Sequence, residues 1–144
     1  MKIGPTVRLP FLLMVAILAS CQTMSDVVRA KNEGAAKLYP VSGDQAWKIA
    51  MTVFRWEGAD AIEEHRDEGY MVTSSSPGLA TYGTLMGAWI EPITETQTQV
   101  TVVTKRRVVT NLITTLTETT FHIRFAQAVD ILKAGKPLPV TPPE

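Results

Sequence analysis

Three side chains that could perform acid–base or metal chemistry lie at alternate positions in the chain: Glu63, His65 and Asp67. On a β-strand these residues would share one face, because successive side chains point to opposite sides. Two carboxylates beside an imidazole could bind a divalent metal or transfer protons. A strand end next to a turn is also an ordinary place for solvated charges, and His122 is far away in the sequence. We therefore expect neither a metal site nor a catalytic site here.

Other short motifs in the chain do not predict catalysis either. The serine run Ser74-Ser75-Ser76 lacks the strand–turn–helix context of a nucleophile elbow. Gly83 and Gly87 have the spacing of a helix-dimer motif, but their apolar stretch is too short to span a membrane. Strand glycines or a bulge explain them better. A glycine-rich phosphate loop is also missing from the sequence. The sequence therefore predicts a protein that is not an enzyme and holds no cofactor.

One basic cluster, Lys105-Arg106-Arg107, could contact an anionic group. On a strand, Lys105 and Arg107 would share one face and Arg106 would take the other. Charge-assisted contacts to phospholipid, to lipopolysaccharide phosphate or to an acidic partner are possible uses. A solvated strand end that discourages edge pairing is the alternative.

The only cysteine, Cys21, directly follows an apolar run from Leu9 to Leu18. Lys2 and Arg8 make the segment before the run positive, as in a signal peptide. The run is shorter than the roughly 20 apolar residues that a membrane-spanning helix needs. A lone cysteine in a secreted chain must be a free thiol, be paired with another molecule, or be modified. An uncleaved signal anchor is the alternative interpretation.

The tetrapeptide Leu18-Ala19-Ser20-Cys21 closely resembles a bacterial lipobox. The resemblance implies that residues 1–20 are removed and that Cys21 carries acyl chains, palmitate among them, which bind the mature protein to a membrane. In the Gram-negative lipoproteins that this sequence resembles, aspartate after the cysteine favours retention in the inner membrane. Gln22 therefore favours the outer membrane, at its periplasmic face, although a Gram-positive host is not excluded.

Removal of residues 1–20 leaves 124 residues, enough for one domain. The mature chain has 12 basic and 14 acidic residues, and a nearly neutral protein has no global field that would attract nucleic acid. Residues 21–40 are polar and alanine-rich, and we expect a flexible tether reaching about 25 Å. A short helix capped by Ser25 is the alternative. Four prolines in residues 136–144 predict an extended tail.

The pattern between residues 41 and 135 predicts one α+β domain. An apolar stripe in residues 45–57 indicates a helix that Gly58 ends, and Thr115 with Glu118 forms a capping-box pattern for a last helix ending at Gly135. Four antiparallel strands are expected between them, at residues 59–65, 69–74, 82–91 and 99–109. The simplest arrangement is a two-layer sandwich with both helices on one face of the sheet.

This order of elements resembles a class of small uncharacterised bacterial envelope lipoproteins. The matching stretch runs from Asp44 to Leu132, with Trp47, Gly58 and Tyr70 at recognisable points. It also loosely resembles the helix-grip modules of a lipoprotein subunit of the outer-membrane β-barrel assembly machine. We expect a non-enzymatic, lipid-anchored accessory module that binds another envelope protein. A module that binds a lipid or small molecule between sheet and helices is the second hypothesis.

Overall fold

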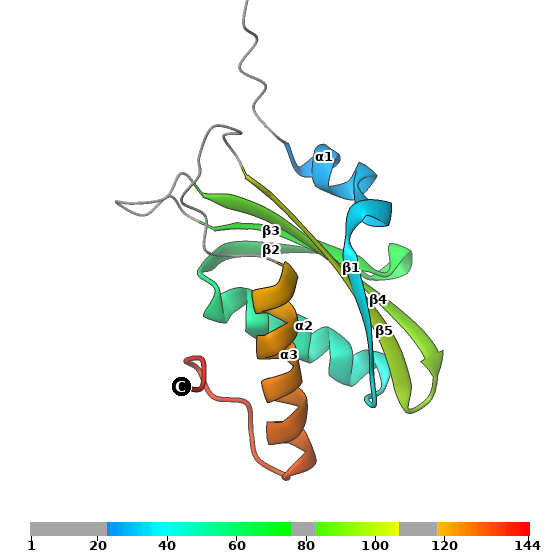
Figure 1. Cartoon of the computed structure of the whole chain (residues 1–144), viewed down its shortest axis with the longest axis vertical. Coiled ribbons are helices and arrows are strands. Elements are labelled where there is room, and N and C mark those ends of the chain that lie inside the picture. Colours follow the sequence, from blue (N-terminus) through cyan, green and yellow to red (C-terminus); the bar gives the residue numbers. More distant parts are fainter. Residues whose placement is uncertain (1–22, 76–82, 107–117) are drawn as a thin grey trace, which may run out of the picture.

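The computed structural model describes residues 23–75, 83–106 and 118–144 (Figure 1). The predictions for Tyr82, for residues 107–109 and for the Thr115 cap lie outside these residues. Within them the elements, in chain order, are α1 (Met24–Arg29), β1 (Ala35–Tyr39), α2 (Gly43–Trp56), β2 (Ala59–His65), β3 (Tyr70–Ser75), β4 (Thr84–Thr94), β5 (Gln97–Arg106) and α3 (Glu118–Lys133), with short 3₁₀ turns η1 (Lys31–Glu33) and η2 (Arg66–Glu68).

The strands form one antiparallel sheet in the order β1-β5-β4-β3-β2. The α+β class is confirmed, but the prediction of four strands is wrong, because β1 adds a fifth beside β5. In this register Ala35 pairs with Val102 and Tyr39 with Thr98. The threonine-rich β5 is therefore an interior strand from Thr98 to Val102, where it is held between β1 and β4.

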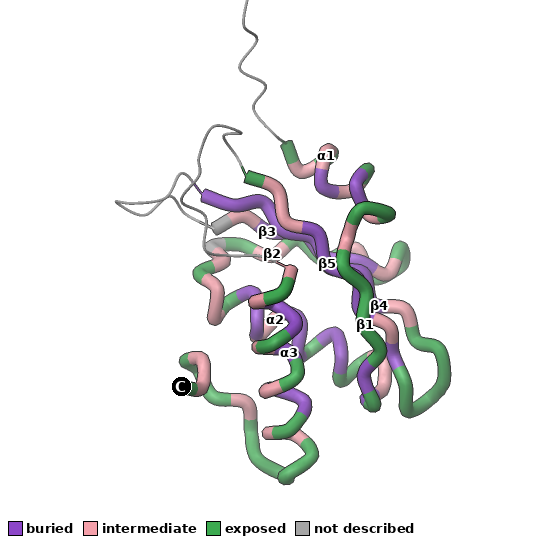
Figure 2. The backbone as a smooth tube through the Cα atoms, in the orientation of Figure 1, coloured by how far each residue is buried: buried purple, intermediate pink, exposed green. Residues whose placement is uncertain are grey.

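Both faces of the sheet are apolar, because buried side chains alternate along the central strands. Met71, Met86 and Val102 point to the face that α2 and α3 cover (Figures 1 and 2). Their neighbours Trp89 and Val103 belong to a second buried cluster on the opposite face. Such a sheet requires a cover on each side.

The two predicted helices, α2 and α3, do lie on one face, but α1 supplies a second cover on the other face, so the predicted two-layer sandwich is wrong. Val27 is fully buried on this face, and Met24 and Val28 pack around it. Gly87 makes the close approach possible: a Cβ atom built there would lie 2.7 Å from Cγ1 of Val27 and 3.0 Å from the Trp89 ring. The domain consequently has three layers, with α1, the sheet, and α2 with α3.

The interpretation of residues 21–40 as a tether is also wrong for most of its length. The capping-box pair at the start of α1 is Thr23 and Asp26, rather than the Ser25 cap of the alternative interpretation. β1 is exposed along Ala35–Leu38 and buries only Tyr39, so its sequence has no strand-like apolar alternation. Pairing with β5 stabilises this strand instead.

A double-mutant cycle tests the contact between α1 and β4. We expect Gly87→Ala to destabilise the protein by about 1–3 kcal/mol, because the added methyl group overpacks the contact with Val27. The cost should shrink in a Val27→Ala background, where the methyl group finds space. Urea unfolding of the four proteins measures both effects. Strictly additive costs would show that the two residues do not touch.

The predicted first helix and hairpin are confirmed with small shifts in their ends. Helix α2 begins two residues earlier than expected because Ser42 and Gln45 form a capping box, in which the Gln45 backbone N–H donates to the Ser42 hydroxyl at 3.3 Å.

Strand β4, however, does not end before Pro92 but continues to Thr94. β3 pairs with β4 only from Leu85 to Trp89, so Pro92 has a strand on one side alone, as an edge proline does.

Helix α3 is joined to the edge strand β1 through His122, a buried residue of α3. Its Nε2 donates to the Ala35 carbonyl at 2.8 Å, and its Nδ1 accepts from the Tyr39 hydroxyl at 2.7 Å. A carbonyl oxygen only accepts, so Nε2 carries a proton, and burial disfavours a second proton on Nδ1, which leaves the imidazole neutral in this network. Burial lowers the pKa of His122 and raises the pKa of Tyr39.

This network predicts a loss of stability in acid. Because the pKa of His122 is lower in the folded protein than its ordinary 6.5, the unfolded chain binds an extra proton as the pH falls below 6.5. The free energy of unfolding should therefore fall between pH 7 and pH 5, as urea titrations would show. His122→Gln should remove this part of the dependence, since glutamine does not titrate. An identical pH profile in the variant would contradict the assignment.

The proline-rich C-terminal segment packs against the helices rather than extending freely. The indole N–H of Trp56 donates to the Pro139 carbonyl at 3.0 Å, Arg124 donates to the Pro143 carbonyl, and Leu138 contacts the core. Figure 1 shows the segment returning beside α2 and α3. Trp56, which is half-buried, thus anchors the tail of its own chain.

Candidate functional site

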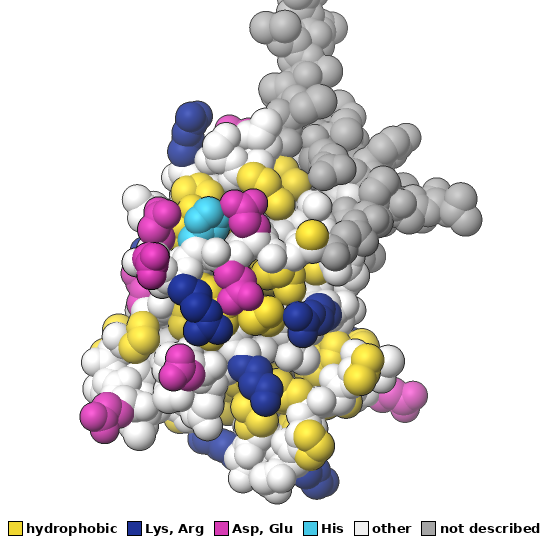
Figure 3. Space-filling view, turned by 180° about the vertical axis from the view of Figure 1, so that it is seen from behind, with side chains coloured by type: hydrophobic (Ala, Val, Ile, Leu, Met, Phe, Trp, Pro, Cys, Tyr) yellow, Lys and Arg dark blue, Asp and Glu magenta, His cyan; other side chains and the backbone are white. Residues whose placement is uncertain are grey.

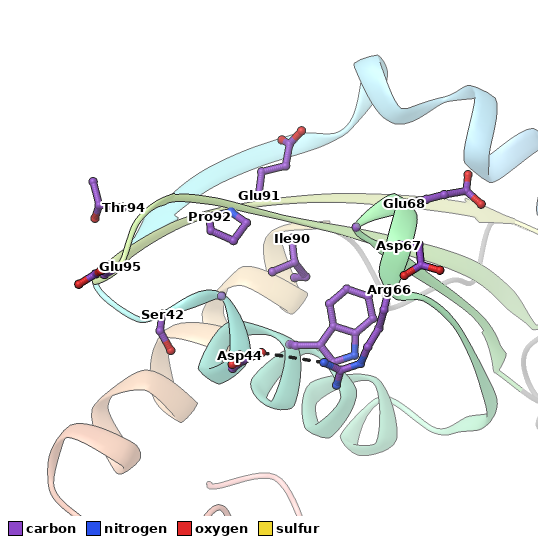
Figure 4. Close-up of a pocket in the computed structure, with 13 residues that line it drawn as sticks. Ser42, Asp44, Arg66, Asp67, Glu68, Ile90, Glu91, Pro92, Thr94 and Glu95 are labelled. Atoms are coloured by element: carbon purple, nitrogen blue, oxygen red, sulfur yellow. Dashed lines mark ion pairs between the residues drawn. The ribbon is translucent and has the colours of Figure 1, made fainter.

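A cleft in the described part of the chain lies at the end of the sheet where β4 turns into β5. It forms between the first turn of α2, η2 and the last residues of β4, and it has a volume of about 690 Å³ (Figure 4). The lining residues are Ser42, Gly43, Asp44, Trp47, Arg66, Asp67, Glu68, Gly69, Ile90, Glu91, Pro92, Thr94 and Glu95. This volume is typical of sites for small ligands or for a few side chains.

The inner wall of the cleft is apolar and rigid. Trp47 and Ile90 are each about 5% exposed, and Pro92 packs against Gly43, where an added Cβ would lie 2.6 Å from Cγ of the proline. The indole N–H of Trp47 donates to Glu64 of β2 at 2.6 Å, which fixes the ring. This hydrogen bond is also the main reason that the pKa of Glu64 is lowered.

Arg66 covers one side of this wall. Its guanidinium carbon lies 4.7 Å from the centroid of the Trp47 ring, a cation–π arrangement. Its Nε donates to Glu64 at 3.3 Å, and Nη1 lies 4.0 Å from Asp44 (Figure 4). One face of the Trp47 ring is therefore already stacked against a cation of the same chain.

Carboxylates surround the mouth of the cleft. Asp44, Asp67 and Glu95 are exposed and come from three different elements: α2, η2 and the β4–β5 turn. Glu91 differs, because its side chain points to the opposite face of the sheet (Figure 4), where it pairs with Lys31 at 2.7 Å. Asp44 faces Arg66, and with Asp67 and Glu95 also exposed the mouth has a net negative charge.

The structure brings only two of the three candidate chemical residues on β2 and η2 together. His65 Nε2 lies 2.7 Å from Glu63, and its ring stacks on Tyr70 with centroids 4.5 Å apart. Asp67 lies on η2, beyond the strand, and lines the cleft instead, while Glu68 approaches His65 Nδ1 at 3.8 Å. Figure 3 shows acidic side chains gathered around the histidine visible on this face. The described residues contain no group of three or more that could hold a metal ion.

The basic cluster lies at the other end of the sheet, where β5 ends. Lys105 forms an ion pair with Glu33 at 2.6 Å, whereas Arg106 is exposed. Arg107 and Cys21 lie outside the described residues. Among the helices that the structure describes, none is long and apolar enough to cross a membrane.

The sequence did not predict the cleft, and comparison with known proteins does not identify it. Trp47 could be placed on the apolar stripe of a helix, but most of its neighbours in the cleft, from Arg66 to Glu95, are 19 to 48 residues away in the chain. No family model, curated protein or solved structure matches the chain. The function is therefore argued from the residues and their geometry.

Proposed function

We propose that this protein is a lipid-anchored, non-enzymatic binding module of the cell envelope, held at the periplasmic face of the outer membrane. The anchor rests on the lipobox-like Leu18-Ala19-Ser20-Cys21 and on the signal-peptide pattern before it. Two or three acyl chains on Cys21, as the resemblance implies, would hold the protein on the membrane far more firmly than one chain can.

The observation that carries the binding role is the composition of the cleft. A rigid apolar wall of Trp47, Ile90 and Pro92 lies behind a mouth that bears three exposed carboxylates. Lysine and arginine side chains combine an apolar stem with a charged head, so they match both parts. We accordingly propose that the partner is an envelope protein that inserts a basic side chain over the wall.

A small cationic molecule is the second candidate for the cleft. The volume of about 690 Å³ suits such a ligand, but the cleft is open and its mouth is charged. These features favour a polar amine over the lipid that a sheet–helix cleft would otherwise suggest.

Site-specific photo-crosslinking in cells tests the binding role. A photoreactive residue at Thr94, which lines the cleft and carries no charge, is expected to capture a defined partner from the envelope. The same residue at Ala126, exposed on α3, serves as the position control. Equal capture from both positions would contradict a specific site.

Charge reversal then tests the chemistry of the partner. Asp67→Lys combined with Glu95→Lys should reduce the Thr94 adduct at least tenfold, about 1.4 kcal/mol of affinity, because the mouth would repel a basic group. Asp130→Lys with Glu144→Lys makes the same change in charge on exposed residues outside the cleft, and should leave the adduct unchanged. An adduct that survives the first pair would show that the cleft does not recognise a cation.

A further inference from the structure

We propose that the domain rests directly on the lipid surface by the end of the sheet that carries α1, and that the acidic cleft opens away from the membrane. This inference rests on the proposed lipidation of Cys21. A domain held in this way has a fixed orientation on the membrane and does not move freely on a tether. Its partner must then approach from the aqueous side.

The first argument is the length of the spacer. Thr23 is the N-cap of α1, and its backbone N–H donates to Asp26 at 2.7 Å and so closes the first turn of this helix. Only Gln22 separates this residue from Cys21. Two peptide units span at most about 8 Å, so α1 would lie at the level of the head groups.

The second argument is the place of α1 on the sheet. Val27 contacts Gly87, only three residues from the start of β4 at Thr84. Thr84 pairs with Arg106, the last residue of β5. The start of β4, the end of β5 and the start of α1 therefore lie at the same end of the sheet (Figure 1). β4 then extends away from this end for 11 residues, about 35 Å, to the turn that borders the cleft.

The third argument is the difference in charge between the two ends. The cleft end carries the exposed carboxylates Asp44, Asp67 and Glu95. Among the described residues, the anchored end carries the exposed cations Arg29 and Arg106 and the carboxylate Asp26, and Lys105 there is neutralised by Glu33. An anionic lipid surface repels the acidic end and tolerates the other, so electrostatics favours the same orientation as the short spacer.

The orientation narrows the class of partner. A basic segment of a periplasmic protein, or of a protein domain that projects well above the bilayer, would reach the cleft. A segment at the level of the head groups would not reach it, because the length of the sheet lies between. The cleft and the anchor thus lie at opposite ends of the sheet.

Fluorescence quenching on vesicles tests this orientation. Lipidation occupies the sulfur of the only native cysteine, so a cysteine introduced at Ser25 or at Thr96 gives a unique site for a fluorophore. Both residues are exposed, one in α1 and one in the β4–β5 turn. The full-length lipoprotein is reconstituted in phosphatidylcholine vesicles containing phosphatidylglycerol and a lipid with a quencher on its head group. We expect at least fivefold stronger quenching at Ser25 than at Thr96.

A spacer variant provides the control. Twenty glycine and serine residues inserted between Gln22 and Thr23 should reduce the quenching at Ser25 toward the level at Thr96. Equal quenching at both sites without the insertion would overturn the orientation while leaving the anchor intact. Failure of the protein to float with the vesicles would overturn the lipidation as well, so the two failures are distinguishable.

Discussion

Replacement of Val27 by aspartate is expected to lower the free energy of unfolding by about 3 kcal/mol. Val27 is fully buried between α1 and the sheet, above Gly87. A carboxylate there must either lose its hydration or drive α1 off the sheet, and both outcomes cost several kcal/mol of transfer or packing energy. Urea unfolding measures the loss, and a red shift of tryptophan emission would show that Trp89 has become exposed.

The matched control is Ser25→Asp, which introduces the same residue into the same helix at an exposed position. We expect it to change stability by no more than about 0.5 kcal/mol. If Val27→Asp were equally harmless, α1 would not belong to the folded domain. Residues 21–40 would then be the flexible tether that the composition alone suggests.

The second large effect is expected from Cys21→Ser. The substitution removes the sulfur that would carry the acyl chains, and each buried methylene group contributes roughly 0.8 kcal/mol to membrane binding. The protein should therefore be lost from the outer-membrane fraction, and be found instead as the uncleaved precursor, held in the inner membrane by its signal peptide, or in the soluble fraction. Fractionation with immunodetection measures it.

Gln22→Asn is the control for this experiment, because it alters the neighbouring residue without removing the sulfur or adding a charge. It should leave the protein in the membrane fraction. Recovery of the Cys21→Ser variant in the outer-membrane fraction at the level of the wild type would show that another part of the chain holds the protein there.

The elements with strong periodic patterns were predictable, and those stabilised by partners were not. The stripe of Trp47, Ala50 and Phe54 identified α2, and Gly69 marked the β2–β3 turn because it adopts a φ of 74°. In α1 and β1, by contrast, few side chains are buried: Val27, Ala30 and Tyr39. Their stability comes from Gly87 and β5, more than 50 residues away, which no local pattern reveals.

The cleft was beyond prediction for a similar reason. Asp67 was singled out from its spacing to His65, yet η2 turns it away from β2 and toward Trp47. Its neighbours there, Asp44 and Glu95, looked like ordinary solvated charges in the sequence. Only the packing of α2 against the far end of β4 brings these carboxylates around one apolar wall.

Intact-mass spectrometry of the protein purified from membranes tests the proposed anchor most directly. The lipid-anchored module predicts a chain that begins at Cys21 and carries a diacylglyceryl group on its sulfur, with or without an acyl group on its amino terminus. A chain that begins at Met1, or one whose Cys21 is unmodified, would contradict the anchor and with it the orientation of the domain on the membrane.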